Sequence, residues 1–218
     1  GNQAVIEFLL KEGITLYSRH VVDVVREGDM NALMTVIEHL KFHNNWNPHL
    51  EKRCTQRNLF LCPSLYSYQA ILQKVGTDTF STAVYLAYCN EKFDMVNHLK
   101  KNRVILSMDM LLGVLLYSSQ QAVFRLIQTL KDTGSWDSNW CLASVALQIA
   151  YSTQNYDICD LLIQLGFSLR MKNLPDVIMH HRASLESVKK AIQHLKVTGS
   201  WEPKCYYASK ALRKAYNI

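Results

Sequence analysis

An internal repeat is the feature that most constrains this sequence. Residues 124–151 align without a gap on residues 189–216, and half of the aligned positions are identical. Both copies contain Leu-Lys-x-Thr-Gly-Ser-Trp, at 130–136 and at 195–201. A weaker copy contains Leu40-Lys41 and Trp46, and a fragment recurs at His98-Leu99-Lys100. Self-similarity at a fixed offset is typical of proteins built from stacked structural units.

The spacing of the copies predicts the size of one unit. Equivalent helix ends fall at Lys11, Lys41, Lys74, Lys100, Lys131, Gln164 and Lys196. The mean step between them is about 31 residues, which is enough for two short helices and two turns. The sequence therefore predicts a helical hairpin as the repeating unit.

Helix signals place these hairpins along the chain. Leu126, Ile127 and Leu130 show the spacing of one buried helical stripe, and Gly134 and Gly199 are expected to take the left-handed conformation that ends a helix. Gly28-Asp29 and Ala183-Ser184 mark turns inside hairpins, and the helix after each repeat end is expected to begin at Asp137 or at Glu202-Pro203.

The predicted elements alternate between second and first helices of the hairpins. Second helices are expected near 3–12, 29–43, 65–75, 92–101, 119–132, 155–165 and 184–197. First helices are expected near 14–26, 48–60, 79–90, 105–117, 137–152, 169–181 and 202–216. The fold class is therefore all-α, a right-handed α-solenoid of about seven short helical hairpins with no sheet.

One stretch resembles known helical-repeat families. The residues HVVDVVREGDMNALMTVIEHLKFHNNWNP at 20–48 combine a helix, a Gly-Asp turn, an Ala-Leu start to the second helix, a Lys-containing end and a Trp-x-Pro exit. This pattern is similar to a divergent pentatricopeptide or tetratricopeptide hairpin, although the units are shorter than in those families. The resemblance implies a solenoid that binds other macromolecules. No individual base-reading position can be transferred from it.

Composition agrees with one helical domain over residues 1–218. Four prolines and eight glycines are too few for a sandwich or barrel with frequent turns. No apolar run approaches the length of a membrane span, and the first residues have no signal-peptide pattern, so we expect a cytoplasmic protein without membrane contact. Because the chain starts at Gly1 rather than Met, we expect it to be a piece of a longer protein.

Positive charge gathers at the end of the chain. Residues 1–109 are nearly neutral, whereas most of the net charge of +6 lies after Arg182. We expect Lys210, Arg213 and Lys214 to form one cationic helix face. Cations beside aromatic rings suit single-stranded RNA. The candidate nucleic-acid residues are Arg182, Lys189, Lys190, Lys204, Tyr206, Lys210, Arg213 and Lys214. The same charge also suits a solvated terminal capping repeat, and Tyr206 and Tyr207 also suit packing in the core.

Catalytic and metal motifs are not found in the sequence. It contains neither GxxxxGK[ST] nor GxGxxG, and the histidines and cysteines at 43, 49, 54 and 62 lack zinc-knuckle spacing. Cys89, Cys141 and Cys159 fall in apolar helical stripes, so we expect small buried side chains. We predict no enzyme activity, no cofactor, no metal and no small-molecule substrate.

The chain is therefore predicted to be a non-catalytic helical-repeat binding module. The first hypothesis is an RNA-associated domain acting in post-transcriptional regulation, with a basic C-terminal repeat. The alternative is a protein-interaction scaffold that holds a partner helix or peptide. Lys and Arg in a continuous stripe along the first helices would favour RNA, and scattered positions elsewhere would favour protein.

The recurrent tryptophans yield a stability prediction. Trp46, Trp136 and Trp201 stand at equivalent corners and are expected to pack between units. Trp136→Ala or Trp201→Ala should lower the free energy of unfolding by about 3–5 kcal/mol, because large-to-small changes lose buried contacts. Chemical denaturation measures this change. A near-neutral result would mean that these rings are surface groups.

Overall fold

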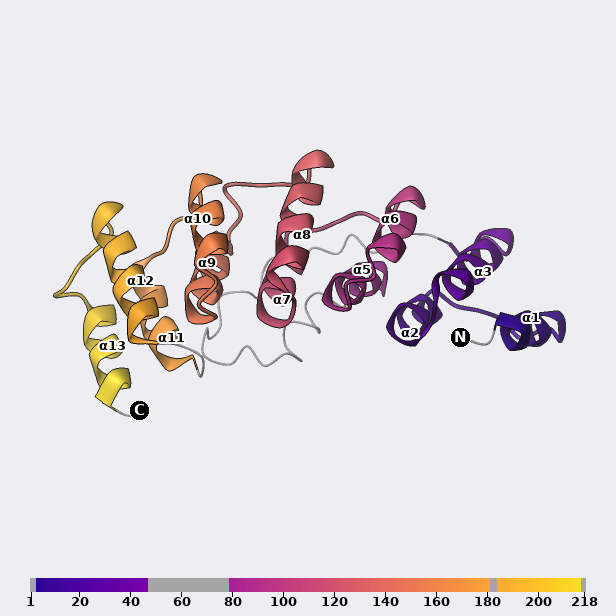
Figure 1. Cartoon of the computed structure of the whole chain (residues 1–218), viewed down its shortest axis with the longest axis horizontal. Helices are drawn as coiled ribbons and strands as arrows, with labels where there is room; N and C mark the ends of the chain where they lie inside the picture. The colour runs from indigo at the N-terminus through magenta and orange to yellow at the C-terminus, as the bar shows by residue number, and fades with distance from the viewer. Residues whose placement is uncertain (1–2, 47–78, 181–183, 217–218) are drawn as a thin grey trace. The chain divides into compact units, whose positions relative to one another are not determined.

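The computed structural model is entirely helical over the residues that it describes, which are 3–46, 79–180 and 184–216 (Figure 1). These residues form twelve α-helices and one 3-10 helix and include no strand, which confirms the all-α prediction. None of the described helices is long and apolar enough to cross a membrane. The helices are α1 (Gln3–Lys11), α2 (Arg19–Glu27), α3 (Met30–Phe42), α5 (Thr79–Cys89), α6 (Phe93–Lys101), α7 (Met110–Tyr117), α8 (Gln120–Asp132), α9 (Ala143–Ser152), α10 (Tyr156–Gln164), η3 (Met171–Asn173), α11 (Leu174–Met179), α12 (Leu185–Val197) and α13 (Tyr206–Tyr216).

The chain divides into two compact units. Of the described residues, those up to 114 belong to the first unit and those from 115 onward belong to the second. The division falls inside α7, and each unit is described here by itself. The single domain expected over 1–218 stays a prediction.

The second helices lie close to their predicted positions. α3, α8 and α12 begin after an N-cap side chain that accepts a hydrogen bond from the backbone three residues later. Asp29 accepts from the Ala32 amide at 2.9 Å, Ser119 from Ala122 at 3.2 Å and Ser184 from Ser187 at 3.2 Å. Such caps satisfy amides that have no partner inside the helix, so the turn residues determine where these helices start.

The described first helices begin later than predicted, except α5, which begins at Thr79 as expected. α9 begins at Ala143 rather than at Asp137, and α13 begins at Tyr206 rather than at Glu202-Pro203. The Asp137 carboxylate accepts a hydrogen bond from the Asn139 amide at 2.8 Å, which forms a local turn in place of a helix start. A non-helical link therefore separates the Trp136 and Trp201 corners from the next helix.

Four of the second helices are followed by a residue with left-handed backbone conformation, always at the same distance from the repeat lysine. Gly134 and Gly199 both have φ +67°, as predicted, and Asn44 and Arg103 take the same place with φ of 57° and 65°. Each stands three residues after a repeat Lys, at 131, 196, 41 or 100. This C-terminal geometry lets the last helical carbonyl groups find partners, as in the 2.8 Å bond from the Ser135 amide to the Leu130 oxygen.

In the first unit, hairpins that are distant in sequence pack directly together. α2 packs against α3 and α5, and α3 packs against α6. The Lys92 ammonium donates to three carbonyl oxygens at the end of α2, those of Val25 (3.0 Å), Arg26 (3.1 Å) and Gly28 (3.1 Å). The hairpin predicted over 48–60 and 65–75 lies outside the described residues. The helices before and after it are nevertheless direct neighbours.

Trp46 adds to the same interface in the first unit. Its indole N–H donates to the Asn102 carbonyl at 3.1 Å, and its ring meets Phe80 edge to face at 4.6 Å. The Lys41 ammonium donates to the Asn102 side chain. The expectation that this tryptophan packs between hairpins is confirmed.

In the second unit, α9 contacts α10, α11 and α12, and α11 contacts α12 and α13. Trp136 stacks on Phe167 with ring centroids 5.1 Å apart and planes 14° apart. A buried hydrogen bond of 3.0 Å runs from the side-chain amide of Asn173 to the side-chain oxygen of Gln148. Both units are thus helical arrays with packing between successive hairpins.

Gly113 provides a test of the packing between α5 and α7. A Cβ atom at Gly113 would lie 2.5 Å from Cε2 of Tyr85, whose side chain is 2% exposed. Ala for Gly inside a helix normally stabilises it by about 1 kcal/mol. Here Gly113→Ala should instead destabilise the protein by about 1–3 kcal/mol, because the buried ring must move. Urea denaturation checks the sign, and a stabilised variant would contradict this packing.

Candidate functional site

The predicted nucleic-acid residues are spread over two helices and a link. Lys189 and Lys190 lie on α12, Lys204 lies in the link before α13, and Tyr206, Lys210, Arg213 and Lys214 lie on α13. Arg182 lies outside the described residues. Lys189, Lys204 and Arg213 are exposed.

The expected cationic face of α13 is divided. Lys210 and Lys214 are half-buried on a helix that packs against α11, and both interact electrostatically with Asp176 of α11. Burial raises the pKa of Asp176, and the two nearby lysines oppose that rise. Arg213 is exposed instead. The three cations therefore do not form one free stripe, because α11 faces two of them.

The tyrosines at the start of α13 are surface groups. Tyr206 is 66% exposed and Tyr207 is 38% exposed, and their rings meet edge to face at 5.5 Å. The interpretation of this pair as core residues is wrong. The first residues of α13 precede the segment around Ala211, which is the buried part of the helix.

Lys190 has an aromatic partner inside the second unit. Its ammonium lies 4.0 Å from the centre of the Tyr156 ring, and the Tyr156 hydroxyl lies 3.2 Å from the Ser187 hydroxyl. The contact between a cation and a ring face is favourable and joins α10 to α12. Lys190 is therefore engaged within the fold.

Cations in the described part of the chain lie mainly on the second helices. Of the first helices, α5, α7, α9 and α11 contain no Lys or Arg within their bounds, whereas the second helices α1, α3, α6, α8 and α12 each contain at least one. In the second unit α9 is instead mostly buried, because eight of its ten residues are buried. A continuous basic track along the first helices is therefore not formed by the described residues.

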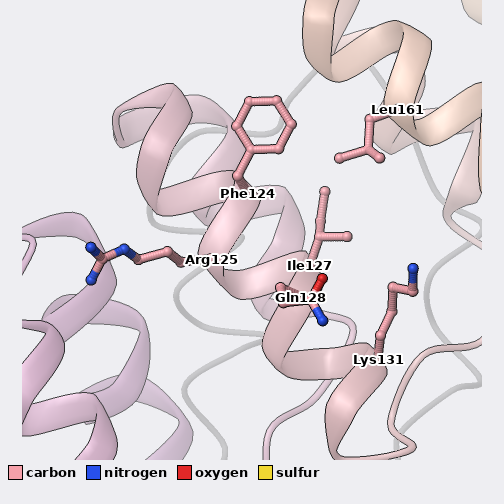
Figure 2. Close-up of a pocket in the computed structure, with 6 residues that line it drawn as sticks. All are labelled: Phe124, Arg125, Ile127, Gln128, Lys131 and Leu161. Carbon is pink, nitrogen blue, oxygen red and sulfur yellow. The ribbon is translucent and has the colours of Figure 1, made fainter.

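A shallow depression of about 320 Å³ lies on the second unit, between α8 and α10 (Figure 2). Phe124, Ile127 and Leu161 provide its apolar wall, and Gln128 and Lys131 provide its polar edge. Phe124 is 38% exposed, although an aromatic ring of this size is usually covered. Arg125 also borders the depression, but its side chain extends to the other side of α8 (Figure 2).

Sequence reasoning missed this depression, although one signal was available. The self-alignment pairs Phe124 with Lys189, so an apolar ring replaces a cation at an exposed repeat position. The lining residues come from different hairpins, and only their packing brings Leu161 next to Phe124.

Cys159 is buried in α10, where its thiol is poorly suited to act as a nucleophile. Burial raises the pKa of the Cys159 thiol to about 12, and the neighbouring Asp160 adds to the effect, so this thiol stays protonated. Cys89 is half-buried and Cys141 is exposed. The expectation of a buried Cys141 is wrong, because α9 begins two residues after it. Within the described ranges no group of three or more His, Cys, Asp or Glu side chains could hold a metal ion. Positions 49, 54 and 62 lie outside these ranges.

The three histidines of the repeated His-Leu-Lys segments have lowered pKa values, mainly because of burial. His194 is 8% exposed, and its Nε2 accepts a hydrogen bond from the Leu169 amide at 3.2 Å. His39 lies 4.3 Å from the His43 ring. Through these contacts the rings of His39 and His194 pack against other side chains or backbone in the last turns of α3 and α12.

No protein-family model, curated protein or solved structure matches this chain. The all-helical architecture with packing between successive hairpins agrees with the predicted helical repeat at a coarse level. The pentatricopeptide or tetratricopeptide resemblance stays a prediction.

His194 makes stability depend on pH. Its Nε2 can accept the Leu169 amide only when unprotonated, and its folded pKa is lowered from 6.5. The unfolded chain therefore takes up the proton first, and stability should fall as pH decreases below about 6.5, by at most about 1.4 kcal/mol per pH unit. His194→Gln retains an acceptor without titrating. Urea denaturation at several pH values between 7.5 and 5.5 should show a smaller loss in this variant, and parallel pH profiles would contradict the assignment.

Proposed function

We propose that this chain is a non-catalytic helical-repeat module that binds a protein partner. In this proposal its hairpins stack as a right-handed α-solenoid of the pentatricopeptide or tetratricopeptide kind, and it works in the cytoplasm. Solenoids of this type present extended surfaces and commonly act through binding rather than chemistry.

The distribution of cations supports a protein partner over RNA. Phosphate recognition along a strand requires positive charge in a continuous track. The described first helices between α2 and α13 contain no Lys or Arg, and two of the cations on α13 face Asp176. The exposed apolar side chains on α8 and α13, such as Phe124 and Leu212, suit a protein surface better than a phosphate backbone.

RNA association is the second candidate function. Exposed Tyr206, Arg213 and Lys204 at the end of the second unit support it, because an open ring and nearby cations can hold an unstacked base and a phosphate. In this version the contact is local and includes Lys189 rather than the half-buried lysines of α13.

Two measurements on the same preparation separate the candidates. Fluorescence anisotropy with labelled poly-U and mixed-sequence RNA, at about 50 and 200 mM salt, should show no saturable micromolar binding. The lower salt concentration is included because phosphate contacts strengthen RNA binding most there. Photo-crosslinking residues placed at Gln121 on α8 should give adducts in cell extract that survive nuclease. The same crosslinking residue placed at Arg213 on α13 tests the RNA candidate, which predicts nuclease-sensitive adducts at that position.

Tight RNA binding with a steep salt dependence, together with nuclease-sensitive adducts at position 213, would overturn the protein assignment. In that case the variant Lys189→Glu with Lys204→Glu should weaken RNA binding uniformly across sequences, since phosphate contacts do not read bases.

A further inference from the structure

We propose that the depression between α8 and α10 binds a short amphipathic helix of a partner protein. An apolar side chain of that helix would enter against Phe124, Ile127 and Leu161, and a carboxylate about one turn away would pair with Lys131. This inference deepens the proposed function and rests on it.

The apolar wall has the size and position for one or two side chains. Ile127 is almost completely buried at 2% exposed, Leu161 is half-buried and Phe124 is 38% exposed. Figure 2 shows Phe124 and Ile127 on α8 near Leu161 on α10. The volume of about 320 Å³ is at the small end of the range for small-molecule pockets, which suits an anchoring side chain better than a buried cofactor.

The next helix pair is joined by a contact of another kind. Between α10 and α12, the Lys190 ammonium lies 4.0 Å from the centre of the Tyr156 ring. Between α8 and α10, the contact at the start of α8 is a 2.8 Å hydrogen bond from Gln120 to Asp157. This bond joins the two helices, and Phe124, one turn further along α8, is 38% exposed. The depression therefore lies between two helices that are held together at the start of α8.

The walls of the depression favour a helical partner over an extended strand. Both walls are α-helices, whose backbone amides and carbonyls are paired within the helix and offer no strand edge. A segment bound there must satisfy its own backbone groups, which an amphipathic helix does. Its apolar residues, three or four positions apart, would match a groove between two helices.

The charge at the edge favours an acidic helix. The lining includes the Lys131 ammonium and no Asp or Glu, and Arg125 points to the other side of α8. Lys131 is exposed beside Gln128, and Figure 2 shows both side chains on the side of α8 that faces Leu161. The neighbouring Asp132 carboxylate accepts a hydrogen bond from Gln128 at 2.6 Å, so it has a partner of its own. A carboxylate of the partner would therefore meet a cation and would be repelled by no acidic lining residue.

The test uses the whole 218-residue chain and a display library of alanine-based helical peptides, randomised at positions i, i+3, i+4 and i+7. Selection should enrich Leu, Phe or Met at one position and Glu or Asp one turn away. Phe124→Ala should weaken the selected peptides by about tenfold or more, as for an anchor residue. Lys131→Glu should weaken them by about fivefold, and exchanging the peptide Glu for Lys should restore binding to that variant.

Lys196→Glu is the matched control, because Lys196 occupies the repeat position of Lys131 but lies on α12, 5.9 Å from the centre of the Trp201 ring. Binding should be unchanged in this variant, and circular dichroism should show every variant folded. Enrichment of basic peptides, or no enrichment, would overturn the proposal. Selected peptides that bind Phe124→Ala equally well would also overturn it, while leaving protein binding at another surface intact. The RNA measurements described above test the proposed function separately.

Discussion

A single short helical hairpin cannot bury its apolar face, so each hairpin depends on the turn that brings its neighbour into contact. In both units this turn follows the second helix, where the chain enters a left-handed residue such as Asn44 or Gly134. Two residues later a tryptophan returns to the neighbouring hairpin. Trp46 bonds to the Asn102 carbonyl, and Trp136 stacks on Phe167. These contacts tie the end of α3 to the hairpin of α5 and α6, and the end of α8 to the link after α10.

The first unit shows that distance along the chain and distance in space are separate quantities. The sequence steps of about 31 residues predict about seven units in succession, with one over 48–75 that lies outside the described residues. Among the described helices α2 packs against α5, and Lys92 caps the end of α2 from the start of α6. A helix end needs partners for its last carbonyl groups, so Lys92 stabilises the end of α2 although it belongs to another hairpin.

The same separation governs the candidate sites. Lys210, Arg213 and Lys214 have the spacing of one helix face, but α13 must bury part of its surface against α11, and Asp176 lies on that side. The depression beside Phe124 has the opposite origin. Its residues come from two hairpins, and it forms where α8 and α10, joined by the hydrogen bond from Gln120 to Asp157, bring the exposed ring of Phe124 next to Leu161.

The sequence by itself determined the helical class and the ends of the second helices. Caps such as Asp29 and Ser119, the repeat lysines and the glycines at 134 and 199 act within a few residues of their position, so local chemistry is sufficient to predict them. Only the tertiary structure decided which hairpins are neighbours, which lysines are free and where an apolar ring stays exposed. These properties depend on which side chains compete for the same buried surface, and residues far apart in sequence determine the outcome.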